Sequence, residues 1–505
     1  MKIKFLFIFA SFVVCNTFAA HHYTESATEK YFESVKNNPE QLHQFLNDMP
    51  KGGDLHMHLS GASWAENMIH YGKDDQLCVN EYRYNVYPNP VCADEYRLET
   101  VQNHPELYNA IIDAWSMRNF VAGKESGHDH FFATFGKFKA ISDNHTGELL
   151  SEVAERAGEQ NELYLEIMTT PDKNHSGVLG KKVGWDPDFN AMRNKLFVAG
   201  LLDIVKEMSA NLTVDEHILD STLHCGTDQA MPGCKVKIRY LYQVLRGQPP
   251  EQVFAQLLAG FEAARTEPRI VGINMVQPED NKTSMRDYSL QMQMIGYLHQ
   301  VYPDVHISLH AGELVPGLVS SDGLRFHIRQ AVEVANAERI GHGVDITHED
   351  DYQKLLQEMS QKHVMVEINL SSNAAILNVV GPDEPIELYM KNAVPVALST
   401  DDEGVSRSTL TMEYQRAVNT YQFNYPTLKN FSRNSLFYSF IPGRNLWNDY
   451  QYQQRVPDCA NDKLVKAKIS ASCQKFLNEN EKANAQWQLE KKFAEFEQKY
   501  SLMLY

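Results

Sequence analysis

The sequence predicts a closed (β/α)8 TIM barrel, an α/β fold in which eight parallel strands alternate with helices. From residue 51 onward, short apolar and β-branched runs alternate with longer amphipathic stretches, as in a parallel sheet with crossover helices. Eight such runs extend over roughly 350 residues, which favours a closed barrel over an open doubly wound sheet. No GxGxxG follows the first strand and no GxxxxGK[ST] occurs anywhere, which weakens the case for a nucleotide cofactor.

The eight apolar runs define the strands that we expect. They are Asp54–His58, Leu163–Met168, Lys235–Leu241, Ile270–Val276, His306–His310, Arg339–Gly343, Val364–Leu370 and Pro395–Thr400. The amphipathic segments between them include Leu149–Gln160, Pro250–Arg265 and Leu324–Ala337. These units assign residues 51–444 to the barrel.

The first 19 residues predict a signal peptide. A short basic stretch precedes an apolar run at residues 5–14 that is too short for a permanent membrane anchor. Thr17-Phe18-Ala19 then supplies a small-x-small cleavage site. No later run is long and apolar enough for a transmembrane helix, so we expect a secreted or periplasmic protein without a membrane partner after signal cleavage.

Three further regions lie outside the regular barrel units. We expect an N-terminal helical extension at residues 20–50, an insertion after the first strand at residues 72–128, and a C-terminal helical extension at residues 445–505. The insertion is rich in Tyr, Asn and Pro, and the tail ends in a charged segment with a helical pattern.

Beyond Cys15, the chain holds six cysteines in three local pairs. The pairs are Cys78 with Cys92, Cys225 with Cys234, and Cys459 with Cys473. In an oxidising compartment, an even and locally clustered set predicts disulfides. Six cysteines allow fifteen connectivities, among which we favour nearest-neighbour pairing.

The formal net charge is −18, from 65 acidic and 47 basic residues. An acidic surface of this kind repels phosphate backbones and anionic lipid head groups. We therefore expect no nucleic-acid partner, whereas a small molecule remains compatible with this charge.

Polar side chains stand at the ends of several predicted strands, where a barrel enzyme carries its reactive groups. The first strand ends with His56 and His58, whose spacing of two directs both imidazoles to one face. The fifth strand ends with His310, and the small Ala-Gly turn after it lets Glu313 reach back over the barrel mouth.

Two later strands add further polar groups. His342 stands between two glycines at the end of the sixth strand, which leaves its ring facing a pocket. The eighth strand leads into Asp401, Asp402 and Glu403. Three consecutive acids after an apolar strand are costly unless a cation or hydrogen-bond donors face them.

These strand ends together supply three nitrogen ligands and one oxygen ligand: His56, His58, His310 and Asp401. Such a set suits a catalytic zinc ion with room for water. The fourth strand has no lysine that could be carbamylated to bridge a second metal, so we expect one zinc ion per chain.

A second pair of histidines with the same spacing, His128 and His130, provides an internal comparison. The pair stands at a loop-to-helix junction, where Asp129 has the position of an N-cap, and phenylalanines follow. We interpret this pair as structural.

The segments DLHMHLSGA, YLEIMTTP, IVGINMV, LHAGE, RIGHGVDI, INLSSN and LSTDDEGVS occur in this order along residues 54–408. In these segments the sequence resembles the adenosine deaminase family, and the succession HAGE, RIGHG and TDD is highly specific. The exported N-terminus and the cysteine-bearing insertion resemble the extracellular, growth-factor-like branch of that family.

The resemblance implies a role for each residue of the site. The zinc ligands would be His56, His58, His310 and Asp401, the last also counted as catalytic. Glu313 would donate a proton to purine N1, and His342 would orient the attacking water and take its proton. Asp402 would hydrogen-bond purine N7, and His58 would also line the substrate pocket.

Two departures from the family pattern concern the substrate side of the site. Soluble members commonly carry an acid that binds the ribose 5′-hydroxyl, where this chain has Ser60. They also carry a glycine whose backbone amide meets purine N3, where this chain has Gln277 followed by Pro278. We expect Ser60 and Gln277 to contact the substrate. Both changes leave the reaction type intact but leave the identity of the purine substrate open.

Three functions are compatible with the sequence. The first is zinc-dependent hydrolytic deamination of adenosine or 2′-deoxyadenosine to the inosine nucleoside and ammonia. The second is deamination of another aminopurine, or of a modified adenine nucleoside or nucleotide. The third is an exported binding or signalling protein on the same scaffold. In each case a homodimer would form through the N-terminal region or the insertion. A cytidine-deaminase site is excluded, because its P-C-x-x-C element does not occur.

Overall fold

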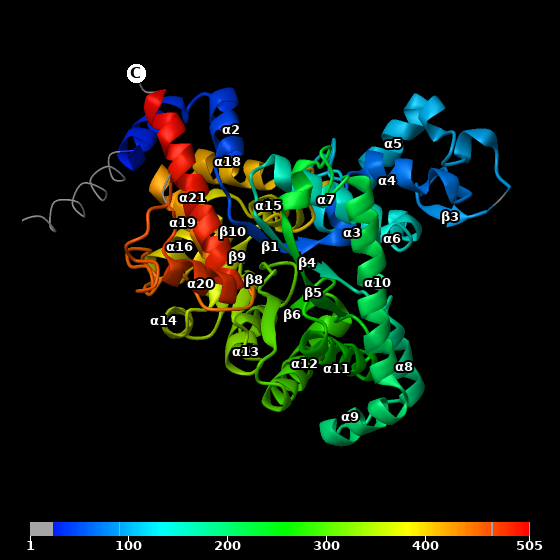
Figure 1. Ribbon diagram of the computed structural model, residues 1–505. Helices are drawn as coiled ribbons and strands as arrows, with labels where there is room; N and C mark the ends of the chain where they lie inside the picture. The colour runs from blue at the N-terminus through cyan, green and yellow to red at the C-terminus, as the bar shows by residue number, and fades with distance from the viewer. Residues whose placement is uncertain (1–23, 90, 466–467, 504–505) are drawn as a thin grey trace, which may run out of the picture.

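The structure, a computed structural model, describes residues 24–89, 91–465 and 468–503. Eight parallel strands form one sheet that curls into a barrel with helices on its outside (Figure 1). The strands are β1 (Gly53–His58), β4 (Tyr164–Thr169), β5 (Lys237–Leu245), β6 (Ile270–Val276), β7 (His306–Ala311), β8 (Arg339–His342), β9 (Met365–Ile368) and β10 (Val396–Leu398). The predicted fold class is confirmed. The predicted signal peptide lies outside the described residues.

The barrel closes between β1 and the residues that follow β10. The backbone N–H of His58 donates to the oxygen of Asp401 at 2.9 Å, and the N–H of Asp401 donates to the oxygen of His56 at 2.9 Å. Asp401 has a φ of 62°, a left-handed conformation that is uncommon for residues other than glycine. The seam of the barrel therefore runs through residues that the sequence predicts as metal ligands.

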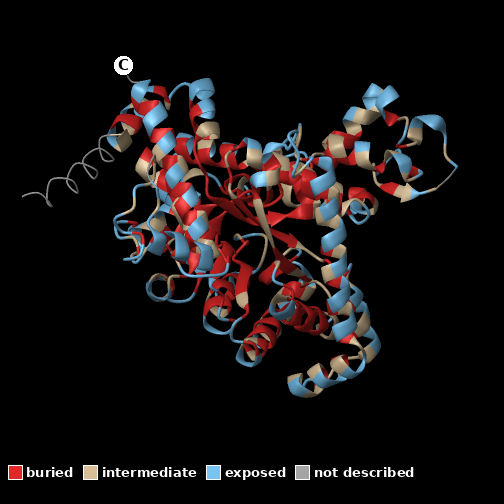
Figure 2. Ribbon diagram, viewed as in Figure 1, coloured by how far each residue is buried: buried red, intermediate tan, exposed pale blue. Residues whose placement is uncertain are grey.

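The barrel strands are buried on both faces. Every residue of β1 and β6 is buried, as expected when helices cover a parallel sheet and side chains fill its interior. Figure 2 shows buried residues concentrated in the strands and in the facing sides of the helices. Charged residues inside the barrel are paired, since Arg339 lies 2.6 Å from Glu166 and 2.6 Å from Glu367.

Amphipathic helices cover the barrel. In α7 the buried residues Leu149, Leu150, Val153 and Ala157 recur at the spacing that lines one helix face. The helices of the barrel region are α3 (Leu59–Ala62), α4 (Ala65–Tyr71), α7 (Thr146–Glu159), α8 (His175–Val183), α9 (Phe189–Val198), α10 (Leu201–Thr222), α11 (Pro250–Thr266), α12 (Lys282–Val301), α13 (His327–Glu333), α14 (Tyr352–Lys362), α15 (Leu370–Leu377), α16 (Ile386–Lys391), α17 (Glu403–Ser406), α18 (Leu410–Tyr421) and α19 (Tyr425–Phe437).

The predicted helix at Leu324–Ala337 is too long, because α13 spans only His327–Glu333. A short 3-10 turn precedes it, and Asn336 has a φ of 60° just beyond its end. The N–H of Ala337 donates to the oxygen of Ala331 at 2.9 Å, which is the backward hydrogen bond of a helix end. The hydrophobic spacing of this segment does not reveal the reversal, so the prediction extended the helix beyond its actual end.

The insertion after the first strand projects from one side of the barrel (Figure 1, blue to cyan). It contains the antiparallel pair β2 (Leu77–Val79) and β3 (Val86–Pro88), and the helix α5 (Pro105–Trp115). Helix α6 (Gly127–Ser142) leads back to the barrel. The sequence did not predict the β2–β3 pair, whose strands have three residues each.

The two terminal extensions pack against each other. A helix at residues 24–35 and α2 (Pro39–Asp48) form the first; α20 (Ala471–Glu479) and α21 (Glu481–Leu502) end the second. Asp48 accepts hydrogen bonds from Tyr500 at 2.8 Å and Lys499 at 2.6 Å, and the ring of Phe45 packs on those of Phe496 and Tyr500. Residues far apart in the sequence thus form one aromatic cluster beside the barrel.

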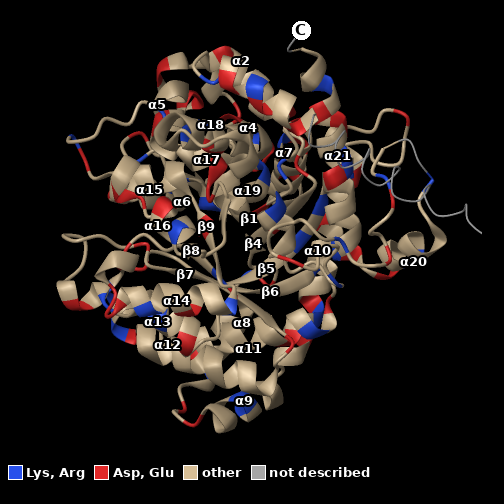
Figure 3. Ribbon diagram, turned by 90° about the vertical axis from the view of Figure 1, so that its left-hand side faces the viewer, with Lys and Arg blue, Asp and Glu red and all other residues tan. Residues whose placement is uncertain are grey.

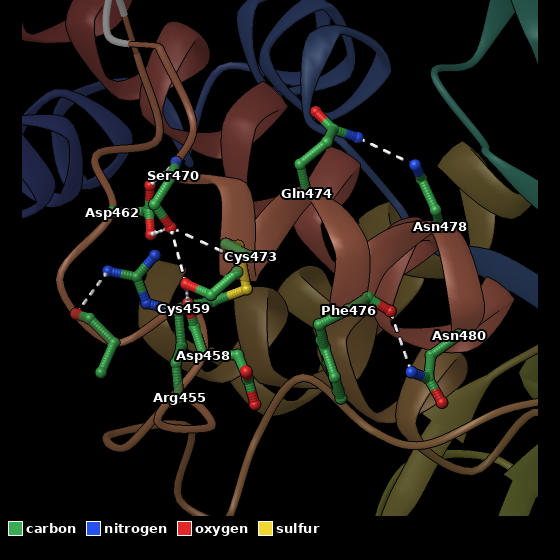
Figure 4. Close-up of a disulfide and its surroundings, with 12 residues drawn as sticks. Arg455, Asp458, Cys459, Asp462, Ser470, Cys473, Gln474, Phe476, Asn478 and Asn480 are labelled. Carbon is green, nitrogen blue, oxygen red and sulfur yellow. Dashed lines mark hydrogen bonds between the residues drawn. A yellow bond between two sulfur atoms is a disulfide. The ribbon is translucent and has the colours of Figure 1, made fainter.

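Three disulfides hold loops of the insertion, the segment before β5, and the tail. They join Cys78 to Cys92, Cys225 to Cys234, and Cys459 to Cys473, which confirms nearest-neighbour pairing. Figure 4 shows the last of these at the start of α20, where Asp462 also binds the Ser470 hydroxyl at 2.7 Å. Disulfides of this number indicate an oxidising compartment.

Acidic and basic residues are interspersed over the helices (Figure 3). Within the described residues, none of the helices combines the length and the hydropathy needed to cross a membrane.

Candidate active site

Three histidines and an aspartate converge at the C-terminal end of the barrel. Nε2 of His310, on β7, lies 3.1 Å from Nε2 of His56 and 3.1 Å from Nε2 of His58, both on β1. Oδ1 of Asp401 lies 3.5 Å from Nε2 of His56 and 3.2 Å from Nε2 of His58. The structure therefore brings together all four residues of the expected ligand set.

Buried polar side chains orient two of these imidazoles from behind. Nδ1 of His56 lies 2.7 Å from the Glu367 carboxylate on β9, and Nδ1 of His310 lies 2.9 Å from Oδ1 of Asn274 on β6. Oδ1 of Asn274 also accepts the backbone N–H of His310 at 3.1 Å, which fixes the oxygen on that side. Because both partners accept, each ring carries its proton on Nδ1 and directs an Nε2 lone pair into the site.

Arg339 keeps Glu367 in its charged form. Burial disfavours the Glu367 carboxylate, but Arg339 and His56 outweigh burial and lower its pKa below the ordinary value. The side chains of His58 and Asp401 are also held by hydrogen bonds to polar side chains. Nδ1 of His58 lies 3.3 Å from Oε1 of Gln243, and the Ser372 hydroxyl donates to Oδ2 of Asp401 at 2.6 Å.

The donor set fits a divalent cation. Three Nε2 lone pairs and a carboxylate oxygen point at one another, and their acceptor partners leave no proton between them. Such a group of lone pairs is unfavourable in a buried site without a positive charge at its centre. Three imidazoles and one carboxylate are the ligands of a catalytic zinc site.

Gly341 makes room for one of these rings. A Cβ at Gly341 would lie 2.4 Å from Cε1 of His56, far inside normal contact distance. Glycine at this position of β8 thus leaves room for the ring of His56, which comes from β1 on another side of the barrel.

Glu279, in the loop after β6, holds the turn that carries Glu313. Its two oxygens accept the backbone N–H groups of Gly312 at 3.1 Å and Glu313 at 3.0 Å, and Nδ1 of His327 lies 2.5 Å from Oε1. Gly312 has a φ of 76°, and a Cβ there would lie 2.5 Å from Oδ1 of Asp345. The turn therefore requires glycine.

The side chain of Glu313 is buried beside the ligand set. Its Oε1 lies 3.8 Å from Nε2 of His342, and Oδ2 of Asp401 lies 3.8 Å from the same nitrogen. Burial, with the negative charge of Asp401, raises the pKa of Glu313 well above its ordinary value. A carboxyl group in this position favours its protonated form and can donate a proton.

His342 presents a neutral imidazole to the same space. Its Nδ1 lies 2.8 Å from Oδ1 of Asn373, on α15. Burial lowers the pKa of His342 to about 4. The backbone φ of His342 is 65°, one of several strained conformations at this end of the barrel. A neutral ring held in this way can accept a proton at Nε2.

Asp402 lies next to the ligand set, with an oxygen that faces no donor. The residue is buried and its Oδ1 has no hydrogen-bond partner among the described residues. Burial, together with the Asp401 charge, raises the pKa of Asp402 well above its ordinary value. Gly61 permits this position, because a Cβ there would meet Oδ1 of Asp402.

The two positions that depart from the family pattern lie on different elements of the rim. Ser60 is half-buried in α3, directly before Gly61. Gln277 is exposed after β6, with a φ of 81°, and its Oε1 accepts the backbone N–H of Gly247 at 2.9 Å. The glutamine thus adopts a backbone conformation that favours glycine, and its side chain is bound to Gly247.

Comparison with known proteins identifies the family of this chain. The adenosine deaminase family profile matches residues 102–448. The chain belongs to the adenosine deaminase family. It is similar to an adenosine deaminase of Vibrio vulnificus, with 26% identity over 377 residues that cover 74% of this chain and 89% of that protein. An adenosine deaminase of Xenopus tropicalis is 22% identical over 394 residues, covering 77% and 90%.

Solved structures share the fold of this deaminase. An Arabidopsis N6-mAMP deaminase has a TM-score of 0.51 and 18% identity, covering 79% of this chain and 95% of that chain. An amidohydrolase from Burkholderia ambifaria with bound zinc has a TM-score of 0.51 and 15% identity, covering 79% and 88%. The family assignment makes this chain an adenosine deaminase-like hydrolase, in a metal-dependent family that deaminates aminopurines.

The second histidine pair of the deaminase lies on α6 and is not part of the ligand set. Nδ1 of His130 lies 2.8 Å from Glu125, and Nε2 of His128 lies 2.9 Å from Asp280 in the loop after β6. The prediction of Asp129 as N-cap is wrong. Ser126 caps α6 by accepting the N–H of Asp129 at 3.2 Å, because the helix begins earlier, at residue 127.

Sequence reasoning missed the buried side chains that hold the ligand set, His342 and the Glu313 turn in this deaminase. They are Gln243, Asn274, Glu367, Ser372, Asn373 and Glu279. Two of them share one feature, because Asn274 in β6 and Glu367 in β9 are each the single polar residue of a buried apolar strand. A buried polar residue of this kind must have a hydrogen-bond partner, but the sequence does not show which histidine that partner is.

Proposed function

We propose that this protein catalyses the hydrolytic deamination of adenosine or 2′-deoxyadenosine, with one zinc ion per chain. The observation that carries the proposal is the convergence of the ligands with two further groups of opposite character. Glu313, whose raised pKa favours the protonated carboxyl, and His342, whose lowered pKa favours the neutral imidazole, lie 3.8 Å apart beside Asp401. Addition of water to a purine ring needs an acid and a base in this arrangement.

The residues that would hold zinc are His56, His58, His310 and Asp401. When bound, zinc lowers the pKa of water to about 7 and so supplies a nucleophile at neutral pH. The zinc reported in the Burkholderia ambifaria amidohydrolase, which shares the fold, is consistent with this choice of metal.

Glu313 would act on the ring nitrogen. In its protonated form it donates to purine N1, which makes C6 more electrophilic as the water oxygen bonds to it. The raised pKa of Glu313 suits this role, since an ionised carboxylate has no proton to give.

His342 would accept the proton that the attacking water loses. Its Nε2 faces the site, and its lowered pKa keeps the ring neutral before the reaction. The proton then leaves with the exocyclic amine as ammonia, and the purine becomes the inosine nucleoside.

The remaining residues would bind the substrate. Asp402, favoured in its protonated form, would donate to purine N7, and His58 would line the purine pocket. Gln277 would offer its backbone N–H to purine N3, because its side chain is engaged by Gly247. Ser60 would face the ribose 5′ end.

Ser60 also favours a second candidate, a 5′-substituted adenine nucleotide. An acid at this position repels a phosphate, whereas a serine hydroxyl can donate a hydrogen bond to one. The Arabidopsis neighbour is named as an N6-mAMP deaminase, a nucleotide enzyme on the same fold.

Release of the C6 amine by metal-analysed protein tests these candidates, measured as ammonia, or as methylamine from N6-methyladenosine. The panel is adenosine, 2′-deoxyadenosine, N6-methyladenosine, AMP and adenine. We expect the highest kcat/KM with adenosine or 2′-deoxyadenosine. A preference for AMP would favour the nucleotide candidate. No amine released from any of the five, at full zinc occupancy, would overturn the proposal and favour the exported binding or signalling protein.

The proposal places the enzyme outside the cytoplasm, in the growth-factor-like branch of the family. Its parts would be a signal peptide at residues 1–19, extensions at 20–50 and 445–505, and a barrel at 51–444 with the insertion at 72–128. Dimerisation would use the N-terminal region or the insertion. Mass spectrometry of exported protein should find Ala20 at the N-terminus and no free thiol, and light scattering gives the oligomeric state.

A further inference from the structure

A chain of buried hydrogen bonds leads from His342 away from the site to Glu384. Nδ1 of His342 lies 2.8 Å from Oδ1 of Asn373, and Nδ2 of Asn373 donates to Oε2 of Glu384 at 2.9 Å. Glu384 lies between a short 3-10 turn and α16, some forty residues along the chain from His342. All three residues are buried, with at most 3% of Glu384 exposed.

The carboxylate sets the direction of each hydrogen bond in the chain. Burial raises the pKa of Glu384 to about 7, and above that pH its carboxylate can only accept, so the amide nitrogen of Asn373 faces it and the amide oxygen faces His342. His342 must then donate from Nδ1. Its Nε2 carries a lone pair, on the side where Glu313 and Asp401 lie.

A second contact agrees with this tautomer. Nδ2 of Asn369, at the start of α15, lies 3.4 Å from Nε2 of His342, where a donor can approach only an unprotonated nitrogen. Glu384 itself has few competing partners, because its Oε1 faces no donor among the described residues. Asn373 is thus the group whose orientation Glu384 controls.

We propose that Glu384 is a positioning residue, which fixes the tautomer of His342 through Asn373 and so keeps Nε2 ready to accept a proton. The inference rests on the proposed function, in which His342 takes the proton from the attacking water. Removal of this control would leave His342 in a mixture of tautomers, one of them with a proton on Nε2 and unable to act as base.

The test exchanges the acid and the amide between the two positions. In Glu384→Gln, both side chains are amides, so Asn373 can turn its nitrogen toward His342. At about pH 8, where Glu384 is ionised, we expect kcat with adenosine to fall by about 10²-fold, with KM nearly unchanged. In the double variant Asn373→Asp/Glu384→Gln, the aspartate can only accept, from His342 and from Gln at 384. That variant should recover most of the lost rate.

The tautomer is read directly in zinc-loaded protein by 15N NMR of labelled histidine, with the His342 signals assigned by their loss in His342→Ala. We expect protonated Nδ1 in the native and double variants, and a mixture in Glu384→Gln. Glu387→Gln, an exposed glutamate three residues further on, is the matched control and should change neither tautomer nor rate. Zinc content and melting temperature show that each variant is folded.

Two outcomes would overturn the inference. One is a native tautomer and a rate within twofold of native in Glu384→Gln; the other is a folded double variant that keeps the defect of Glu384→Gln. Failure of the proposed function looks different, because no purine would be deaminated while the tautomer of His342 still changed in Glu384→Gln.

Discussion

His58 and Asp401 are joined twice, once by their backbones and once through their side chains. The N–H of His58 donates to the backbone oxygen of Asp401 at 2.9 Å, and Nε2 of His58 lies 3.2 Å from Oδ1 of Asp401. The first contact closes the barrel between β1 and the segment after β10, and the second belongs to the ligand set. Barrel closure and assembly of the site are therefore one structural event.

Replacement of a single ligand should remove metal and activity together. His310→Ala takes away the Nε2 that lies 3.1 Å from both His56 and His58. We expect zinc content, measured by atomic emission, to fall well below one per chain, and ammonia release to fall with it. His306→Ala, at the half-buried start of the same strand, is the matched control and should keep both. Normal turnover by His310→Ala without stoichiometric metal would refute the ligand assignment.

Loss of the acid should leave the metal in place. Glu313→Gln keeps the size of the side chain but removes the proton that N1 would receive. We expect native zinc content and a fall in kcat of about 10²- to 10⁴-fold, measured by ammonia release at saturating adenosine. A change in kcat below tenfold would exclude Glu313 as the proton donor.

A single added methyl group should disturb the ligand set through β8. In Gly341→Ala the new Cβ would lie 2.4 Å from Cε1 of His56, so the ring must move away from the other ligands. We expect zinc affinity, measured by competition with a chelator, to fall by at least about tenfold. Gly136→Ala is the matched control, because a Cβ on this α6 residue meets no atom within 4 Å. Equal zinc affinity in the two variants would show that a methyl group at position 341 does not displace the His56 ring from the metal site.

Glu349 should make stability depend on pH. Its Oε1 accepts the backbone N–H groups of Ile328 at 2.6 Å and Arg329 at 3.2 Å, at the start of α13. Burial raises the pKa of Glu349 from the ordinary value of 4.5 to about 7. Between these two values the folded protein holds a proton that the unfolded chain has released, so the free energy of unfolding falls as pH rises.

Glu349→Gln removes this dependence. Relative to the variant, native protein should lose up to about 3 kcal/mol of stability between pH 4.5 and pH 7, and nothing further above pH 7. Urea unfolding at several pH values measures the difference. A constant difference across this range would mean that Glu349 keeps an ordinary pKa in the fold.

The sequence was sufficient to predict the barrel and the residues that meet at its mouth. Each strand is a local apolar run, and each ligand stands at the end of such a run, as His310 does in β7. In a closed parallel barrel all these ends point the same way, so local pattern and fold class together bring distant side chains to one place.

The partners behind the ligands could not be predicted in the same way. Glu367 serves His56 across the barrel, 311 residues away, and Asn274 serves His310 from the neighbouring strand. Which interior residue meets which histidine depends on strand register and barrel shear, and neither is encoded in the hydrophobic pattern. Backbone reversals such as that at Asn336 were missed for a related reason, since spacing does not report φ.

The packing of the two terminal extensions has a consequence for how the polypeptide reaches its final form. Tyr500 donates to Asp48 across 452 residues, and the ring of Phe45 is covered by Phe496 and Tyr500. A growing chain therefore leaves this aromatic face uncovered until residues 496–500 have been made. The helices at residues 24–48 therefore expose apolar rings that another partner, such as a chaperone, must cover until α21 packs on them.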